Sequence, residues 1–452
     1  PQMIDTLQTI VVALVTFATV VSVHEYGHFW VARRAGVKVL RFSIGFGKPL
    51  LNWRGQDNTE YVIAAIPLGG YVRMADERDG DIAAVDLPRA FNRQSVGKRS
   101  AIAAAGPAAN FLLAILVLWG LFLRGEIGVI PEIATVAPGS IAEQAGLQPG
   151  QEIREIDARE TPTVAAVNFA LLERLGDTGA LNLAVTRPGS DVLIRSEVAI
   201  DKWLKGAEQP DLLEALGVTI RTPPVVPRVG GLTEAGVARS AGFQVGDLLL
   251  EADGTPLPLW IDWVNYVRSR PNQRIEVRVE RAGARENIVV TPASVMAEDK
   301  RIGSVGMSVA LPAIPASQQR RFDRGPLDAL SASLNRTKDL VTFTFKSIAR
   351  MLQGLISPSN LSGPITIAQV AASTAEAGWV AWLGFLALLS VSLGALNLLP
   401  IPILDGGHLV FYGFEAVMGR PLPEKVQLAG YQMGVVLVLS LIHISEPTRP
   451  VT

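Results

Sequence analysis

The sequence predicts a polytopic α-helical membrane protein with four transmembrane helices, a membrane-associated β-hairpin and two extracytoplasmic α+β domains. Hydrophobic residues make up 49% of the 452 positions and charged residues only 18%, and the mean hydropathy is +0.30. Four apolar stretches meet or approach the roughly 20 residues that a helical span requires. The polar segment between the second and third stretches contains an internal repeat. The net charge of -1 gives no indication of a nucleic-acid partner.

The four candidate spans are Thr6 to Ala32, Ala101 to Leu123, Ala377 to Leu404 and Val426 to Ile444. The fourth is the shortest and is interrupted by glycines. A cleaved signal peptide is the alternative for the first stretch, but no small-residue cleavage site follows it. We therefore expect a membrane core in two halves, residues 1–123 and 377–444. The last residues, 445–452, have no helical or apolar pattern and are expected to be a non-native tail.

Positive charges orient these spans. Residues 33–99, between the first two spans, contain twelve lysines and arginines, and Arg33 and Arg99 adjoin the membrane. Because loops rich in lysine and arginine stay on the cytoplasmic side, we expect this loop to be cytoplasmic and residues 124–376 to be extracytoplasmic. With four crossings, the third span returns toward the cytoplasm. The ends of the first and third spans should therefore meet on one side of the membrane.

The first span ends in the motif His-Glu-x-x-His, formed by His24, Glu25 and His28. On a helix, residues four apart lie on the same face, so both imidazoles can turn toward one metal ion. Glu25 is offset by about 100° and could reach a water on that metal without binding it directly. Ionisable groups are costly inside a bilayer and usually mark function there. The alternative is a pair of buried histidines with a structural role.

A zinc hydrolase usually binds its metal through three protein ligands and one water, so two histidines leave one ligand to be found. The chain has no cysteine, which excludes disulfides and thiolate ligands. Asp405 is the best candidate, because prolines interrupt the apolar stretch before it and free backbone groups that only a protein cavity can satisfy. His408 is the rival ligand. Alternatively, Asp405 is a helix-terminating aspartate at the water boundary.

Between the first two spans, residues 41–73 read as two β-strands around a polar turn. Such a hairpin, folded back toward the membrane, could pair an extended substrate strand by edge addition, with Tyr71 as a candidate substrate contact. A simple cytoplasmic cover is the alternative. Further on, Gly106 and Asn110 in the second span allow close helix packing, and Asn110 could bond to the first helix.

The extracytoplasmic segment contains a duplicated domain. Residues 145–150 and 155–157 match residues 241–246 and 251–253, each shifted by 96 positions. We therefore expect one domain at 124–222 and a second at 223–312. The pattern of a short helix, a glycine turn and a strand resembles circularly permuted bacterial PDZ domains. That resemblance implies either a pocket for extended peptide ends or a size filter that restricts access to the site.

Residues 313–376 follow the repeat and contain an amphipathic helix. Its apolar stripe consists of Leu327, Leu330, Leu334, Val341, Phe345, Ile348 and Leu352. A helix of this kind is expected to lie on the membrane surface, in contact with lipid. The alternative is a helix that packs on the two repeated domains.

The motifs HEYGHFWVARRAGV, RFSIGFGKPL, YVIAAIPLGGYVRM, AAGPAANF, LSGPITIAQ and NLLPIPILDGGH occur in this order. In this combination the chain resembles the site-2 family of intramembrane zinc metalloproteases over nearly its whole length. The resemblance implies that His24, His28 and Asp405 bind Zn²⁺, that Glu25 is the catalytic base, and that Asn397 contacts substrate.

The same resemblance implies what the protein acts on and where. The expected substrates are single-span membrane proteins, such as a transmembrane anti-sigma factor already cut on its outer side, and signal-peptide remnants. The protein is then expected in a bacterial inner membrane, within an envelope stress response. A membrane metal-ion transporter and a non-catalytic PDZ scaffold are the alternatives. A transporter does not need Glu25 or the repeat, and a scaffold does not need the four site residues.

Overall fold

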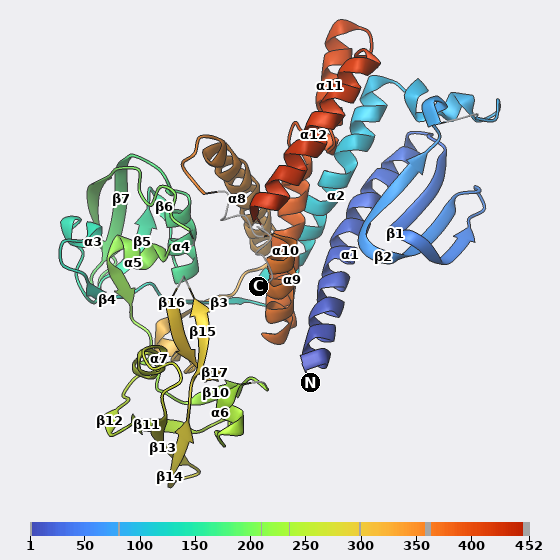
Figure 1. The fold of residues 1–452 in the computed structure, drawn as a ribbon. Coiled ribbons are helices and arrows are strands. Elements are labelled where there is room, and N and C mark those ends of the chain that lie inside the picture. Colours follow the sequence, from blue (N-terminus) through green and yellow to red (C-terminus); the bar gives the residue numbers. More distant parts are fainter. Residues whose placement is uncertain are drawn as a thin grey trace.

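In the computed structural model, long helices of the membrane core lie beside a β-hairpin, and two smaller units lie on the other side of the helices (Figure 1). Three described helices are long and apolar enough to cross a membrane: α1 (Gln2–Arg34), α2 (Val96–Leu123) and α10 (Trp379–Asn397). The structure describes residues 2–79, 82–208, 210–234, 236–297, 300–357 and 363–445.

The fourth predicted span corresponds to α12 (Glu424–Ser445). Its backbone is helical, but its side chains are not described from residue 436 onward, and it does not count among the three candidate spans found within the described residues. Its place in the membrane therefore stays a prediction. The tail predicted to be non-native, 445–452, lies outside the described residues from position 446.

The first two membrane helices approach closely because glycines replace side chains at their contact. A Cβ atom at Gly27 in α1 would lie 2.3 Å from the carbonyl oxygen of Ala105 in α2. A Cβ atom at Gly106 in α2 would lie 2.3 Å from Nε2 of His28. Small residues at such contacts are typical of membrane helices, which gain no hydrophobic stabilisation from meeting each other in lipid. The backbone of α2 therefore lies directly against the two histidines of α1.

The predicted hairpin is formed by β1 (Val39–Arg54) and β2 (Glu60–Met74), joined by a turn at residues 55–59. Both strands bend, so β1 pairs with β2 on two sides, and Arg41 faces Glu60 on one side and Arg73 on the other. The pairing described for residues 70–74 is with β1 alone, which leaves this segment at an edge of the sheet. The sheet packs on α1 and α2 through Phe29, Ala32, Val37, Val39 and Ile102.

We call residues 124–222 unit 1. Besides β3 (Glu126–Val129), it contains the strands β4 (Ile133–Val136), β5 (Glu152–Ile156), β6 (Arg159–Glu160), β7 (Gly179–Thr186), β8 (Leu193–Ile200) and β9 (Val218–Ile220), and the helices α3 (Ile141–Gln144), α4 (Val164–Leu172) and α5 (Leu212–Leu216). One sheet has the order β6-β5-β7-β8, and β4 pairs with β9. Its own apolar core includes fully buried Ile153, Leu171 and Leu181.

We call residues 223–312 unit 2. It contains the strands β10 (Val229–Leu232), β11 (Leu248–Ala252), β12 (Thr255–Pro256), β13 (Ile275–Arg281), β14 (Ala284–Val290), β15 (Ala293–Ala297), β16 (Lys300–Ser304) and β17 (Met307–Val309), and the helices α6 (Val237–Ser240) and α7 (Trp260–Arg268). The order β12-β11-β13-β14 and the pair β10-β17 repeat the arrangement of unit 1. A β15-β16 hairpin replaces α5, so the two units share one topology, in accord with the sequence repeat.

A two-stranded sheet joins the start of unit 1 to the end of unit 2. β3 (Glu126–Val129) follows α2 directly, and β18 (Gln319–Phe322) precedes the next long helix. They pair antiparallel, with Val129 facing Gln319 and Glu126 facing Phe322. Arg320 also donates hydrogen bonds to Glu152 and to the carbonyl of Pro162. The chain therefore enters and leaves the two units at the same place.

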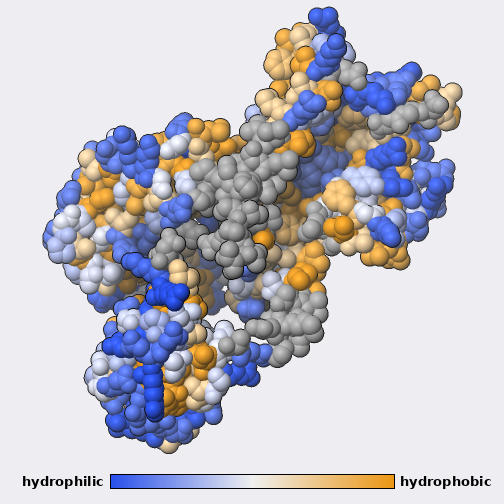
Figure 2. Space-filling model, viewed as in Figure 1, coloured by the Kyte–Doolittle hydropathy of each residue, from blue (hydrophilic) through white to orange (hydrophobic). Residues whose placement is uncertain are grey.

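The predicted amphipathic helix is α8 (Pro326–Leu352), and the face that it buries in the protein is formed mainly by residues outside the apolar stripe. Leu327, Leu334 and Leu352 are exposed, whereas Ala329, Ser333, Thr337 and Leu340 are buried. These mostly small side chains allow α8 to approach α2 and α10, as small residues do elsewhere in membrane helix contacts. The large side chains of Leu327, Leu334 and Leu352 face outward, whereas Leu340 and Val341 belong to the contact with α2 and α10. In the space-filling view, hydrophobic residues show over the membrane helices and parts of the hairpin, while hydrophilic residues cover much of unit 2 (Figure 2).

The remaining helices complete the second half of the core. α9 (Pro364–Glu376) packs on α1, and α11 (Asp405–Met418) packs on α2. Within the described residues, short 3-10 helices occupy connections at Glu77–Asp79, Leu87–Arg89, Phe91–Arg93 and Ala316–Gln318. The apolar stretch predicted as the third span is thus divided. Its helix ends at Asn397, and a new helix begins at Asp405.

Candidate metal centre

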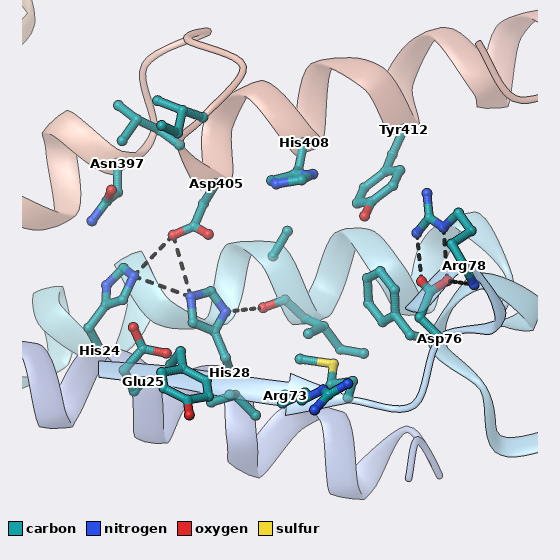
Figure 3. Close-up of a pocket in the computed structure, with 18 residues that line it drawn as sticks. His24, Glu25, His28, Arg73, Asp76, Arg78, Asn397, Asp405, His408 and Tyr412 are labelled. Atoms are coloured by element: carbon teal, nitrogen blue, oxygen red, sulfur yellow. Dashed lines mark hydrogen bonds and ion pairs between the residues drawn. The ribbon is translucent and has the colours of Figure 1, made fainter. Parts of the chain in front are cut away.

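His24 and His28 lie one turn apart near the C-terminal end of α1, and both are buried. Their Nε2 atoms are 3.2 Å apart. Oδ2 of Asp405 lies 3.1 Å from Nε2 of His24 and 3.4 Å from Nε2 of His28 (Figure 3). The three residues predicted as metal ligands therefore point at one another from two different helices, although Asp405 follows His28 by 377 positions.

The chain break before Asp405 has a local cause. Pro400 and Pro402 cannot continue the helical hydrogen-bond ladder of α10, and the turn ends at Leu404, which is extended. Gly406 and Gly407 then press against the carbonyls of the turn, since a Cβ at either position would lie 2.3 Å from a backbone oxygen. Glycine is required there because nothing larger fits. The turn and the two glycines bring Asp405, the first residue of α11, over the histidines.

The donor atoms fit a zinc ion. The Nδ1–H of His28 donates a hydrogen bond to the carbonyl of Ile102 at 2.7 Å, which leaves a lone pair on Nε2. Oδ2 of Asp405 is buried and has no hydrogen-bond partner among the described residues. Two imidazole nitrogens and a carboxylate oxygen within 4.8 Å of one another repel unless a cation or a proton lies between them. Two nitrogens and one oxygen, with room for a water, are a usual ligand set of catalytic zinc.

Glu25 follows His24 on α1 and lies against β2, where a Cβ at Gly70 would be 3.0 Å from its Cγ. It is outside the group of three that could hold a metal. Its carboxylate lines the same cavity, whose volume is about 710 Å³. This is the position expected of a carboxylate that reaches a metal-bound water rather than the metal.

The predicted substrate contacts also line this cavity. Asn397 comes from the end of α10 and Tyr71 from β2. The hydroxyl of Tyr71 accepts a hydrogen bond from Arg41 at 3.0 Å, and its ring stacks on Phe46. The Tyr71 side chain is thus held on the sheet. His408, the rival ligand, lines the cavity one turn along α11 and is not in the three-residue group found among the described residues.

Sequence reasoning missed part of the surroundings. The carbonyl of Ile102 orients His28, and no pattern in the sequence marks a backbone acceptor. A bond from Asn110 to the first helix was expected as a possibility, but not its partner, which is His24, with Nδ2 of Asn110 3.3 Å from Nδ1. At the far end of the cavity, Arg73 and the Asp76–Arg78 ion pair form a charged wall that the sequence did not indicate.

Two histidines, one aspartate and a neighbouring glutamate, set among apolar helices, are the arrangement expected of a membrane-embedded zinc metalloprotease. Comparison with known families agrees with this class of protein, because the family described as "Peptidase family M50" matches residues 12–441 of the chain. The chain belongs to peptidase family M50, the site-2 protease family.

Curated relatives match over almost the whole chain. A protein of Vibrio cholerae whose name marks it as a zinc metalloprotease is 40% identical over 444 residues, 98% of each chain. The regulator of sigma-E protease RseP of Escherichia coli is 40% identical over 436 residues, 96% of each chain. Its counterpart in Salmonella typhimurium is 39% identical over 445 residues. A solved PDZ domain from Listeria monocytogenes matches 20% of this chain and 93% of its own, with 13% identity and a TM-score of 0.17, too distant to support an argument.

Proposed function

We propose that the protein is an intramembrane zinc endopeptidase in which His24, His28 and Asp405 bind the metal and Glu25 is the catalytic base. The convergence of the three donor atoms, which all lie within 4.8 Å of one another, is the observation that carries this assignment. Zinc held by these three residues would supply an activated water and a polarised peptide carbonyl. Glu25 would accept a proton from the attacking water and donate it to the leaving amine.

A transmembrane substrate hides its peptide bonds in helical hydrogen bonds, so it must be unwound before it can react. We propose that residues 70–74 of β2 bind the unwound segment as an added strand. This segment is an edge of the hairpin sheet, and Tyr71, Val72, Arg73 and Met74 line the cavity. Asn397 faces the same space and would orient the carbonyl of the substrate near the metal.

The proposed substrates are single-span membrane proteins, including an anti-sigma factor that has first been cut outside the membrane, and signal-peptide remnants. The names of the relatives from Escherichia coli and Salmonella typhimurium, which refer to regulation of sigma-E, support this part. Units 1 and 2 are proposed to be extracytoplasmic PDZ domains that act as a size filter, with peptide-end binding as the second possibility. α12 is proposed as the fourth span, with the site toward the cytoplasm of a bacterial inner membrane.

The decisive test is Glu25→Gln in a membrane cleavage assay, with zinc content measured on the same preparation. The expected result is a loss of cleavage of about 100- to 10,000-fold with zinc retained, because the base is removed and the ligands are not. Glu77→Gln is the matched control, since Glu77 is an exposed carboxylate that pairs with Arg93 outside the cavity. Cleavage that persists with zinc bound contradicts the role of Glu25.

The ligand set is tested separately by metal analysis. His24→Ala and Asp405→Ala are expected to lose zinc, whereas His408→Ala is expected to retain it. Zinc loss in His408→Ala together with retention in Asp405→Ala would exchange the two assignments. Retention of zinc in His24→Ala would mean that the histidines of α1 have a structural role.

A further inference from the structure

Asn110 is a completely buried polar side chain in the middle of α2. Its amide lies against His24, with Nδ2 3.3 Å from Nδ1 of the imidazole. Oδ1 of the same amide is also buried and has no hydrogen-bond partner among the described residues. A buried polar atom without a partner costs about 1–3 kcal/mol. Packing alone would be served better by an apolar side chain of the same size, so the amide itself requires an explanation.

The hydrogen-bond partner of His28 suggests an explanation for the buried amide of Asn110. Nδ1–H of His28 donates to the carbonyl of Ile102, so Nε2 of His28 carries the lone pair that a metal needs. Ile102 and Asn110 are two turns apart on α2, and Gly106 lies between them without a side chain. The same face of α2 therefore meets the Nδ1 atoms of both histidines, and at His28 it offers an acceptor.

An amide nitrogen at Nδ1 would not suit His24. Nδ1 would then have to accept a hydrogen bond, and the neutral imidazole would carry its proton on Nε2. That atom faces Nε2 of His28 at 3.2 Å and Oδ2 of Asp405 at 3.1 Å, where a proton would exclude a metal ion. The two ends of a carboxamide are almost equal in size, so the same space accepts the amide turned by 180°.

We propose that Asn110 is a positioning residue that offers Oδ1 to Nδ1–H of His24 and so fixes the imidazole with its Nε2 lone pair toward the metal. Both histidines then donate Nδ1–H to acceptors on α2, and both Nε2 atoms face Asp405. Partners of this kind, which hold a ligand without touching the metal, set the tautomer and basicity of metal-bound histidines. The inference rests on the proposed zinc binding by His24 and adds the group that orients it.

The test compares Asn110→Leu, Asn110→Ala and Asn110→Asp in the full-length protein, purified in detergent. The readouts are the rate at which a chelator removes zinc and the visible absorption spectrum of the cobalt-substituted protein. Loss of the acceptor in the Leu and Ala variants is expected to accelerate zinc loss about 10- to 100-fold. Asn110→Asp keeps an oxygen at this position and is expected to retain zinc as the unaltered protein does, or longer.

Ser390→Ala is the matched control. The Ser390 hydroxyl donates to the backbone carbonyl of Asn110 at 2.8 Å, so this variant removes a buried contact at the same residue without changing the amide. It is expected to leave zinc retention unchanged. Zinc retention in the Ala and Leu variants equal to that of the unaltered protein overturns the proposal, as does an Asp variant that loses zinc as fast as they do.

His24→Ala in the same series separates this inference from the proposed function. If His24→Ala loses zinc and Asn110→Ala does not, only the role of Asn110 fails. If His24→Ala retains zinc, the proposed ligand set fails first, and the positioning role fails with it.

Discussion

Units 1 and 2 have the same topology but different relations to the membrane core. Unit 1 packs on α8 through Phe169, whose ring lies 5.4 Å from that of Phe343, and Arg336 of α8 stacks over the same ring. Arg159 pairs with Asp339, and Arg350 pairs with Asp177 at 2.9 Å. The ion pairs described in unit 2, such as Arg278–Glu251, stay within the unit.

The difference lies in a few side chains rather than in the fold. At the offset of 96 residues, unit 2 has Thr255 where unit 1 has Arg159, and Asn265 where it has Phe169. Neither replacement can stack on an aromatic ring of α8 or pair with its carboxylate. Among the described contacts, the residues that dock on α8 therefore belong to unit 1 and have no equivalent side chains in unit 2.

A second difference lies inside the units. Asp247 of unit 2 is buried and accepts two hydrogen bonds from Arg281, as well as one from the N–H of Gln244. In unit 1 the same turn is held by neutral Gln151, which accepts from the N–H of Gln148. Unit 2 thus depends on a buried charge for its internal stability, and unit 1 does not.

The largest expected effect follows from removing that charge. Asp247→Ala should lower the free energy of unfolding of unit 2 by about 3 kcal/mol, the low end for breaking a buried pair because Arg281 keeps some contact with water. Gln151→Ala, its counterpart in unit 1, should cost about 1 kcal/mol, the value of a neutral hydrogen bond. Hydrogen exchange of β11 and of β5 in the full-length protein measures both. Equal losses in the two units would remove this difference between them.

A smaller effect is expected at the docking surface. Arg159→Thr with Phe169→Asn gives unit 1 the residues of unit 2 and should weaken its contact with α8 by about 2 kcal/mol, mostly through the lost aromatic packing. Spin labels on unit 1 and α8 should then report a broader distance distribution. Arg195→Ala, which removes the Arg195–Glu155 pair within the sheet of unit 1, is the control and should leave the distribution narrow. An unchanged distribution in the double variant would show that docking rests on other contacts.

The smallest expected effect is a pH dependence of the stability that Asp247 contributes to unit 2. Burial would raise the pKa of Asp247, but the hydrogen bonds from Arg281 and from the N–H of Gln244 lower it, and its pKa lies below the ordinary value. A carboxyl whose folded pKa is lowered contributes stability above its unfolded pKa of about 3.9, and this contribution is lost as pH falls through the folded pKa. The stability difference between the unaltered protein and Asp247→Asn should therefore narrow from pH 7 to pH 3. A constant difference would contradict the pairing.

The sequence was informative wherever a contact is encoded locally. His24, Glu25 and His28 lie within one helical turn, and the prolines before Asp405 mark a break in any helix. The structure brings these residues to one cavity, as the motifs indicated. Their chemical roles remain predictions, because geometry shows proximity and not reaction.

Other features depend on partners far away in the chain. The apolar periodicity of α8 predicted a helix with its apolar stripe on lipid, but it did not indicate which residues would contact α2 and α10. In lipid, large apolar side chains gain nothing from turning inward, and close packing selects small ones such as Ala329 and Ser333 instead. The double pairing of Arg41 likewise depends on where both strands bend. No local sequence pattern specifies which face of α8 packs on the other helices or where the two strands bend.

The short β3–β18 sheet gives the two units a mechanical property. β3 and β18 lie at the two ends of the segment that contains units 1 and 2. Because neighbouring strands lie about 4.8 Å apart, their pairing holds these two ends side by side. Force transmitted along the chain from either unit would therefore reach α2 and α8 at the same point. A pull on the two units would then load both helices in parallel rather than stretch one connection.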